Sequence, residues 1–221
     1  MPTSKLSDQL YDKIKHDILH LRLKPGETVS IQKISELYGG SRTPVREAFI
    51  RLEQEGLVIV RPQSGTVISP ISINRVRQER FVRMALETAV ADEFVKTCSQ
   101  LTLDTMEHLN EILQRDYARG DYDTAIERDN RFHRMLFETS DNVFAFDTGM
   151  NNASHDLRLR YLTISECGQG DNVLTDHERI LEAARAGDAK RLSACITEHL
   201  SNWRRGVDGL RETCPETYFC D

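Results

Sequence analysis

Residues 41–48 read SRTPVREA, and this stretch decides the fold of the first third of the chain. Thr43 directly before Pro44 has the residue types of a helix N-cap and a first helical position, which predicts the start of a helix. The helix is expected to run to about Glu55, because Gly56 is a residue type that ends helices.

The segments around this helix complete a predicted winged helix-turn-helix. The expected elements, taken from apolar spacing, cap residues and β-branched runs, are a helix over 6–21, a helix from Ser30 to residue 37, the helix that starts at Thr43, and strands over 57–61 and 66–69. Pro62-Gln63-Ser64-Gly65 has the composition of a turn between the two strands. Three helices followed by a hairpin give a DNA-binding domain over residues 1–70.

The rest of the chain, residues 71–221, is predicted to be all helical. Helical spacing, Thr/Asp caps and glycine breaks place helices over 73–98, 101–119, 122–140, 142–165, 172–186 and 189–211. Six helices joined by short connections form an antiparallel bundle. The fold class is therefore mainly α, with a winged helix-turn-helix and a six-helix bundle.

Composition agrees with a helical, water-soluble protein that is expected in the cytoplasm. Of 221 residues, 39% are hydrophobic and 29% charged, with 12 Gly and 6 Pro. We find no apolar stretch of the roughly 18 residues that a membrane helix needs, so no membrane partner is expected. The five cysteines are scattered without a Cys-x-x-Cys pair, which argues against a disulfide framework or a cysteine zinc site.

Charge is divided unevenly between the two predicted domains. Residues 1–70 hold ten Lys/Arg against eight Asp/Glu, a net charge of +2, and the remainder holds 19 against 27, a net charge of −8. The excess acid therefore lies outside the predicted DNA-binding domain, so the overall charge of −6 does not exclude a nucleic-acid partner.

The start of the third helix carries the predicted DNA contacts. Arg42 and Arg46 flank the helix start, where a side chain that enters the major groove can bond bidentately to guanine. Ser41, Thr43 and the wing-tip Gly65 are expected to contact the DNA backbone. The alternative is that both arginines pair with Glu47 or with solvent on a helix surface. The order of helix, turn and hairpin favours double-stranded operator DNA as the partner.

Four ionisable residues fall on inward faces of the predicted bundle. Asp129 and His133 are four residues apart on one apolar stripe, and His177 and His199 lie on the stripes of the last two helices. A buried polar group without a partner costs about 1–3 kcal/mol. A single inward histidine is usually a satisfied core residue. Three of them with a carboxylate favour a divalent metal ion, zinc first, with nickel and manganese as alternatives.

Two arginines are candidates for holding an anionic ligand. Arg83 lies on the stripe of the first bundle helix, and Arg160 borders the stripe of the fourth. Arginine suits carboxylates because its planar guanidinium donates two parallel hydrogen bonds. The alternative for both residues is a salt bridge between helices, and for Arg160 this alternative carries at least equal weight.

The first 70 residues resemble the GntR family of bacterial regulators. The resemblance is carried by Leu23–Glu27, Ser41–Ala48, Leu52, Glu55–Val58 and Gly65–Val67. It implies that the residues aligned with Arg42, Arg46 and Gly65 lie at the DNA. Gly40 and Phe49 depart from the valine and leucine that are usual in the family, and neither position is a proposed contact.

The second domain resembles the FCD effector domain of the FadR branch, in its shorter VanR-type version. In metal-binding members of that domain the ligands are an Asp, a His four residues later, and two His on the last two helices. Asp129, His133, His177 and His199 match these positions one by one. The resemblance implies a small organic or sugar acid as effector, an arginine near Arg83 that holds its carboxylate, and repression as the commoner outcome.

The leading hypothesis is a homodimeric regulator that reads a palindromic operator and responds to a ligand bound at the metal. A metal-dependent hydrolase is the first alternative, but no second acid or base lies beside the ligands at recognisable spacing. A metal sensor without an organic ligand is the second. We therefore expect no enzyme activity.

Overall fold

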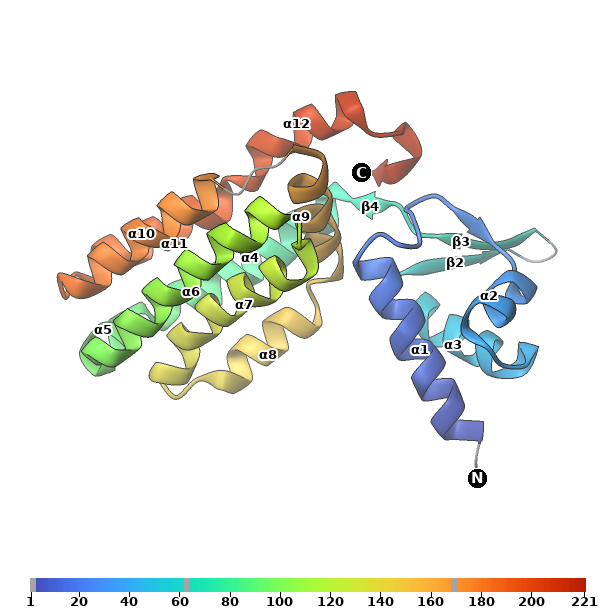
Figure 1. Ribbon diagram of the computed structural model, residues 1–221, viewed down its shortest axis with the longest axis horizontal. Coiled ribbons are helices and arrows are strands. Elements are labelled where there is room, and N and C mark those ends of the chain that lie inside the picture. The colour runs from blue at the N-terminus through green and yellow to red at the C-terminus, as the bar shows by residue number, and fades with distance from the viewer. Residues whose placement is uncertain (1–2, 62–63, 168–170) are drawn as a thin grey trace. The chain divides into compact units, whose positions relative to one another are not determined.

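The computed structural model describes residues 3–61, 64–167 and 171–221, which form two compact units (Figure 1). One unit comprises Met1–Ile73 together with Cys214–Asp221, and the other comprises Asn74–Thr213. The sequence places the boundary after residue 70 and assigns everything beyond it to the second domain. In the structure, the chain passes into the helical unit after Ile73 and returns to the first unit at Cys214.

The first unit contains the predicted helix-turn-helix and hairpin. Its elements are α1 (Thr3–Leu19), β1 (Thr28–Val29), α2 (Ile31–Tyr38), α3 (Arg42–Gln54), β2 (Val58–Arg61), β3 (Gly65–Ile68), β4 (Ile71–Ser72), a 3-10 turn (Glu216–Tyr218) and β5 (Phe219–Cys220). The strands β1, β3 and β2 form an antiparallel sheet in that order. Pro62 and Gln63 of the predicted turn lie outside the described residues. Fully buried Ile14, Ile18, Val45, Leu52 and Leu57 hold the helices and the sheet together.

The start of α3 differs from the prediction. Ser41, and not Thr43, is the N-cap, with extended backbone angles of φ −86° and ψ 168°. Pro44 therefore occupies the third position of the helix. Proline is tolerated there because the first backbone N–H groups of a helix have no intrahelical acceptor. Gly56, with φ +74°, ends the helix as expected.

The second unit is the predicted helical bundle, with three of the six helices each divided in two. Its elements are α4 (Ile73–Ala89), α5 (Ala91–Thr97), α6 (Gln100–Arg119), α7 (Tyr122–Thr139), α8 (Val143–Asn151), α9 (Ser154–Cys167), α10 (Asp171–Arg185), α11 (Ala189–Ser201) and α12 (Trp203–Thr213). The divisions fall at Val90, at Asn152-Ala153 and at Asn202. They are breaks of one or two residues without Pro or Gly, so apolar spacing alone continues through them. The predicted glycine breaks at Gly168 and Gly170 lie outside the described residues.

The core of the second unit lies between helices that run side by side (Figure 1). Phe94, Phe132, Leu136, Ile180 and Ile196 are among its fully buried residues. Helix α7 lies against α6, and α10 lies against both α6 and α11, so side chains from α7, α10 and α11 meet inside the bundle. No helix among the described residues is long and apolar enough to cross a membrane. The predicted fold class is confirmed.

Candidate metal centre and nucleic-acid interface

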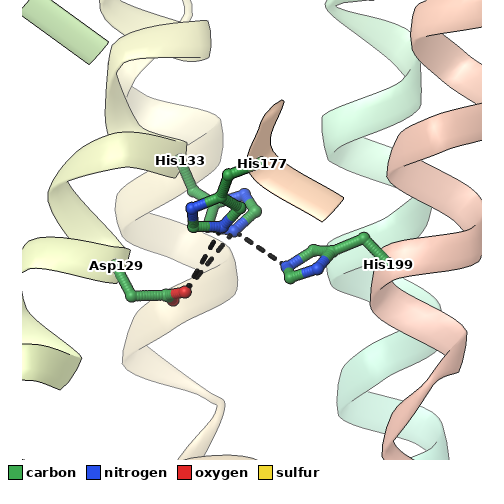
Figure 2. Close-up of side chains that lie close together, drawn as sticks. All are labelled: Asp129, His133, His177 and His199. Carbon is green, nitrogen blue, oxygen red and sulfur yellow. Dashed lines mark hydrogen bonds and ion pairs between the residues drawn. The ribbon is translucent and has the colours of Figure 1, made fainter. Parts of the chain in front are cut away.

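The four predicted metal ligands meet inside the helical unit (Figure 2). Asp129 and His133 come from α7, His177 from α10 and His199 from α11. One ligand atom from each residue lies within 4.8 Å of the others, and all four side chains are buried. The i, i+4 spacing on α7 and the inward stripes of α10 and α11 therefore deliver the arrangement that the sequence predicts.

The three imidazoles turn the same ring nitrogen towards the centre. His133 Nε2 lies 3.2 Å from His199 Nε2, and His177 Nε2 lies 3.5 Å from Asp129 Oδ1. Figure 2 shows the rings of His133, His177 and His199 facing one another and the carboxylate of Asp129. The phenyl ring of Phe132 stacks on His177 at a centroid distance of 3.9 Å and fixes the plane of that ring.

Each imidazole is held from behind by an oxygen atom. Glu87 Oε2 lies 2.7 Å from His133 Nδ1, and Asn110 Oδ1 lies 3.0 Å from His177 Nδ1. The third oxygen is Oδ2 of Asp176, 3.3 Å from Nδ1 of His199. An acceptor at Nδ1 places the proton on that nitrogen and leaves the Nε2 lone pair facing the centre.

The protonation states match a cation site. Burial lowers the pKa of His177 well below its ordinary value, and burial also lowers the pKa of His133 despite the neighbouring Glu87. Burial is the largest single influence on Asp129 and opposes its ionisation, but the neighbouring positive charges, Arg160 first and Arg83 among them, together outweigh it, and the pKa of Asp129 lies far below its usual value. At neutral pH, His133 and His177 are therefore neutral imidazoles and Asp129 is a carboxylate.

One nitrogen atom of this donor set has no hydrogen-bond partner among the described residues, and two others face each other. His177 Nε2 is buried and has no hydrogen-bond partner within the described part of the chain. With protons on Nδ1, the facing Nε2 atoms of His133 and His199 present two lone pairs to each other, which is unfavourable without a positive charge between them. Neutral imidazole nitrogens and one carboxylate are the ligands that zinc and neighbouring divalent ions take, so the residues fit such an ion.

Sequence reasoning missed the three residues behind the imidazoles. Glu87 lies four residues after Arg83 on α4, and this spacing signals their ion pair but not the contact with His133 on another helix. Asn110 on α6 carries no sequence signal for its role. Asp176 directly precedes His177 and yet bonds to His199 on the next helix, because neighbouring residues on a helix point about 100° apart.

A cavity of about 120 Å³ opens beside the four ligands. Its lining includes Arg80, Arg83, Asp129, Arg160, His199 and Trp203. Both predicted anion-binding arginines therefore reach the same space, and Arg80 is a third that the sequence analysis did not single out. The three guanidinium groups are groups that bind anions, and they share the lining with the carboxylates of Asp129 and Asp176.

Arg83 and Arg160 also form salt bridges, which the sequence analysis gave as the alternative to binding an anionic ligand. The Nε of Arg83 lies 2.6 Å from Glu87 Oε1, and Arg160 is ion-paired with Asp129. Arg83 is only 6% exposed, and its Nη2 atom is buried without a hydrogen-bond partner among the described residues. Arg83 thus retains a donor for a ligand, whereas Arg160 links the cavity directly to a candidate metal ligand.

Four of the five predicted nucleic-acid contacts are exposed at one helix start in the first unit. Ser41, Arg42, Thr43 and Arg46 are exposed at the start of α3, and Gly65 is half-buried at the start of β3. Within the described residues, neither arginine forms an ion pair with Glu47. Both side chains are exposed to solvent, as the DNA-contact prediction and the solvent form of its alternative each require. Arg42 Nη2 lies 3.5 Å from Oε1 of Gln32, a residue of α2 that the sequence analysis did not include.

Comparison with known proteins identifies both units. Residues 6–68 match the family described as bacterial regulatory proteins of the gntR family, and residues 80–202 match the FCD domain. The chain is 31% identical to the HTH-type transcriptional repressor RspR of Escherichia coli over 96% of this chain and 92% of that protein. It is 26% identical to a probable D-xylose utilization operon transcriptional repressor of Paenarthrobacter nicotinovorans, over 89% of this chain and 86% of that one.

Solved structures share the fold. E. coli McbR/YncC superimposes with a TM-score of 0.71 at 20% identity and covers 94% of this chain and 98% of its own. A putative GntR regulator from Rhodococcus sp. RHA1 gives a TM-score of 0.72 at 20% identity, over 91% of this chain and 97% of its own.

Proposed function

The chain belongs to the GntR family of bacterial transcriptional regulators and carries an FCD domain, and we propose that it is a homodimeric repressor controlled by a small acid bound beside a divalent metal ion. Its family makes it a regulator with a DNA-binding domain and an effector domain, and not an enzyme. Action on operator DNA places the protein in the cytoplasm.

The observation that carries the metal proposal is the convergence of three Nε2 atoms on one carboxylate. Asp129, His133, His177 and His199 would hold the ion, and Glu87, Asn110 and Asp176 would keep the imidazoles aligned. Zinc is the first candidate, with nickel and manganese as alternatives. When bound, the ion supplies positive charge and coordination positions for a ligand carboxylate.

The cavity beside the ligands supports a small organic or sugar acid as the effector. Arg83 offers its unpartnered Nη2 to a carboxylate, and Arg160 stands between the cavity and Asp129. Binding of an acid at Arg160 would compete with Asp129 for the same guanidinium, which links the effector to the metal ligand set.

Two copies of the first unit are needed for the proposed operator. Winged helix-turn-helix domains read half-sites, and a two-fold dimer matches a palindrome. Repression is proposed because relatives over most of the chain are named repressors. Selection of DNA from a random pool by the full protein tests the proposal, and recovery of palindromic sites supports it. Failure to enrich any sequence from that pool would count against it.

Glu87 is expected to strengthen metal binding from behind His133. The substitution Glu87→Gln keeps the shape but removes the negative charge that supports the Nδ1 proton, so zinc affinity should fall about tenfold or more. Competition titration with a zinc chelator measures the change. The matched control is Glu93→Gln, on the exposed side of α5, which should leave zinc affinity unchanged. Equal affinities for the two variants would contradict the role given to Glu87.

Arg83 is expected to carry the effector. In a thermal-shift screen of sugar acids and dicarboxylates on the zinc-loaded protein, the acids that raise Tm for the unmodified chain should lose most of this effect with Arg83→Gln. Arg77→Gln is the matched control, because Arg77 lies on the same helix and is exposed beside Asn74. A full response in Arg83→Gln would remove Arg83 from the effector site.

A further inference from the structure

The chain connects its two units at two places, and this feature lies outside the family resemblance. The first connection follows Ile73, where α4 begins, and the second follows Thr213, where α12 ends. We name residues 214–221 the C-terminal strap. They lie beyond the stretch that matches the FCD domain, which ends at residue 202.

The strap is docked on the first unit through backbone pairing and a close contact. Its strand β5 runs parallel to β4, with Phe219 opposite Ile71 and Cys220 opposite Ser72. Figure 1 shows the C-terminus beside β4. A side chain at Gly26 would place its Cβ 2.7 Å from the carbonyl oxygen of Thr217, so the strap reaches the backbone of the turn at Gly26.

This docking position is the base of the wing. Gly26 N–H donates to the carbonyl of Ile68 at 2.8 Å, and Ile68 N–H donates to the carbonyl of Glu27 at 2.9 Å. Ile68 ends β3, the strand that begins at the wing residue Gly65. A shift of the strap therefore acts on the segments that hold β3 at its base.

The other end of the strap leads to the cavity. Helix α12 precedes the strap and begins at Trp203, whose side chain lines the cavity. The side chain of Asn202 donates to Asp176 Oδ2 at 2.8 Å, and the same oxygen atom is the partner of His199 Nδ1. Helix α12 is anchored by buried Val207 and Leu210 and lies against α9, the helix that carries Arg160.

The first connection leads to the same place. Strand β4 is followed directly by α4, which carries Arg80 and Arg83 of the cavity and Glu87 behind His133. Helix α4 thus joins β4 directly, helix α12 joins β5 through residues 214–218, and the two strands are paired with each other. A ligand that moves α12 against α4 can therefore act on these two paired strands, through residues 214–218 on one side and directly from α4 on the other.

We propose that the C-terminal strap transmits the state of the cavity to the wing base, through the pairing of β5 with β4 and the contact of Thr217 with Gly26. Control of the wing base by an effector rests on the proposed function. The coupling between α12 and the wing base through the strap does not require the metal or the effector. It predicts that a perturbation at the start of α12 reaches the first unit only when the strap is docked.

A double-mutant cycle tests this link without any ligand. Asn202→Ala removes the bond to Asp176, and a chain that ends at Thr213 removes the strap. Hydrogen exchange of the amides of residues 66–72 is measured in the unmodified protein, in each variant and in the combination. We expect Asn202→Ala to change these rates by about tenfold in the full chain and by less than about twofold in the shortened one. An equal effect in both chains, or no effect in either, overturns the proposal.

A point substitution in the full chain tests the same coupling in case the shortened chain does not fold. Gly26→Ala places a methyl group against Thr217 and should undock the strap, whereas Gly56→Ala has the same backbone strain, at φ +74° against +77°, and no atom within 4 Å of the new group. The effect of Asn202→Ala should vanish in the Gly26→Ala background and persist in the Gly56→Ala background. Persistence in both backgrounds overturns the proposal.

Zinc separates a failure of this inference from a failure of the proposed function. If zinc binds the full chain and slows hydrogen exchange in the bundle but not at residues 66–72, the proposed role of the strap is contradicted and the proposed metal centre is not. If the full chain takes up no zinc, the proposed metal centre is contradicted. The hydrogen-exchange measurements with Asn202→Ala, which need no zinc, then still test the role of the strap.

Discussion

Replacement of Arg46 by alanine is expected to abolish the sequence preference of DNA binding. Arg46 is exposed in the first turns of α3, on the helix that enters the major groove in winged helix-turn-helix proteins. A bidentate arginine contact to guanine contributes about 1–3 kcal/mol of discrimination, and a dimer makes it twice, so specificity should fall by a factor of roughly 30 to 2 × 10⁴. Binding to unrelated DNA should change little, because phosphate contacts elsewhere supply it.

The control for this substitution lies on the same helix. Arg51 points away from the helix start, since its guanidinium stacks over the Tyr11 ring at 3.7 Å and pairs with Asp8 on α1. Arg51→Ala should therefore leave the ratio of operator to unrelated DNA unchanged. Fluorescence anisotropy with the selected operator and a scrambled duplex at fixed salt gives both affinities. A preference in Arg46→Ala that equals the preference in Arg51→Ala would remove α3 as the reading element.

Replacement of His177 by alanine is expected to abolish metal binding and the stabilisation that comes with it. His177 is fully buried, and its Nε2 has no hydrogen-bond partner among the described residues. At a free zinc concentration of 1,000 times Kd, binding stabilises the unmodified protein by about 4 kcal/mol, which corresponds to a rise in Tm of about 10 °C. The variant should show almost no rise and contain almost no metal after purification.

The zinc-induced change in Tm is the quantity to compare, and not Tm itself. Loss of the imidazole also removes the stacking on Phe132, so the variant will be less stable without any metal. His108→Ala is the matched control, because His108 is exposed on α6, where it pairs with Glu111 at 3.5 Å. If zinc raises Tm equally in both variants, His177 is not a ligand.

The first unit was predictable because its signals are local. Caps, turn residues and β-branched runs each act over a few residues, and Ser30 does accept from Lys33 N–H as an N-cap. The sequence predicted the N-cap of α3 at Thr43, because Thr43-Pro44 has the residue types of a cap and a first helical position. The N-cap is Ser41, since the helix starts two residues earlier and tolerates Pro44 in its first turn. Strands β1 and β5 are two residues long and leave no periodic pattern.

The candidate ligands were predictable because burial on a helix is periodic, and the residues around them were not. Asp129 and His133 share a face of α7 by spacing, and the stripes of α10 and α11 select His177 and His199. Contacts between helices depend on how the helices are paired and rotated, which a pattern within one helix does not specify. The roles of Glu87, of Asn110 and of the C-terminal strap therefore emerge only from the fold.

Anomalous diffraction from crystals of the zinc-loaded protein tests the central claim most directly. We predict one peak per chain, at about 2.1 Å from the Nε2 atoms of His133, His177 and His199 and within about 2.2 Å of an oxygen of Asp129. Absence of a peak there, or imidazoles whose Nε2 atoms point away from one another, would contradict the account.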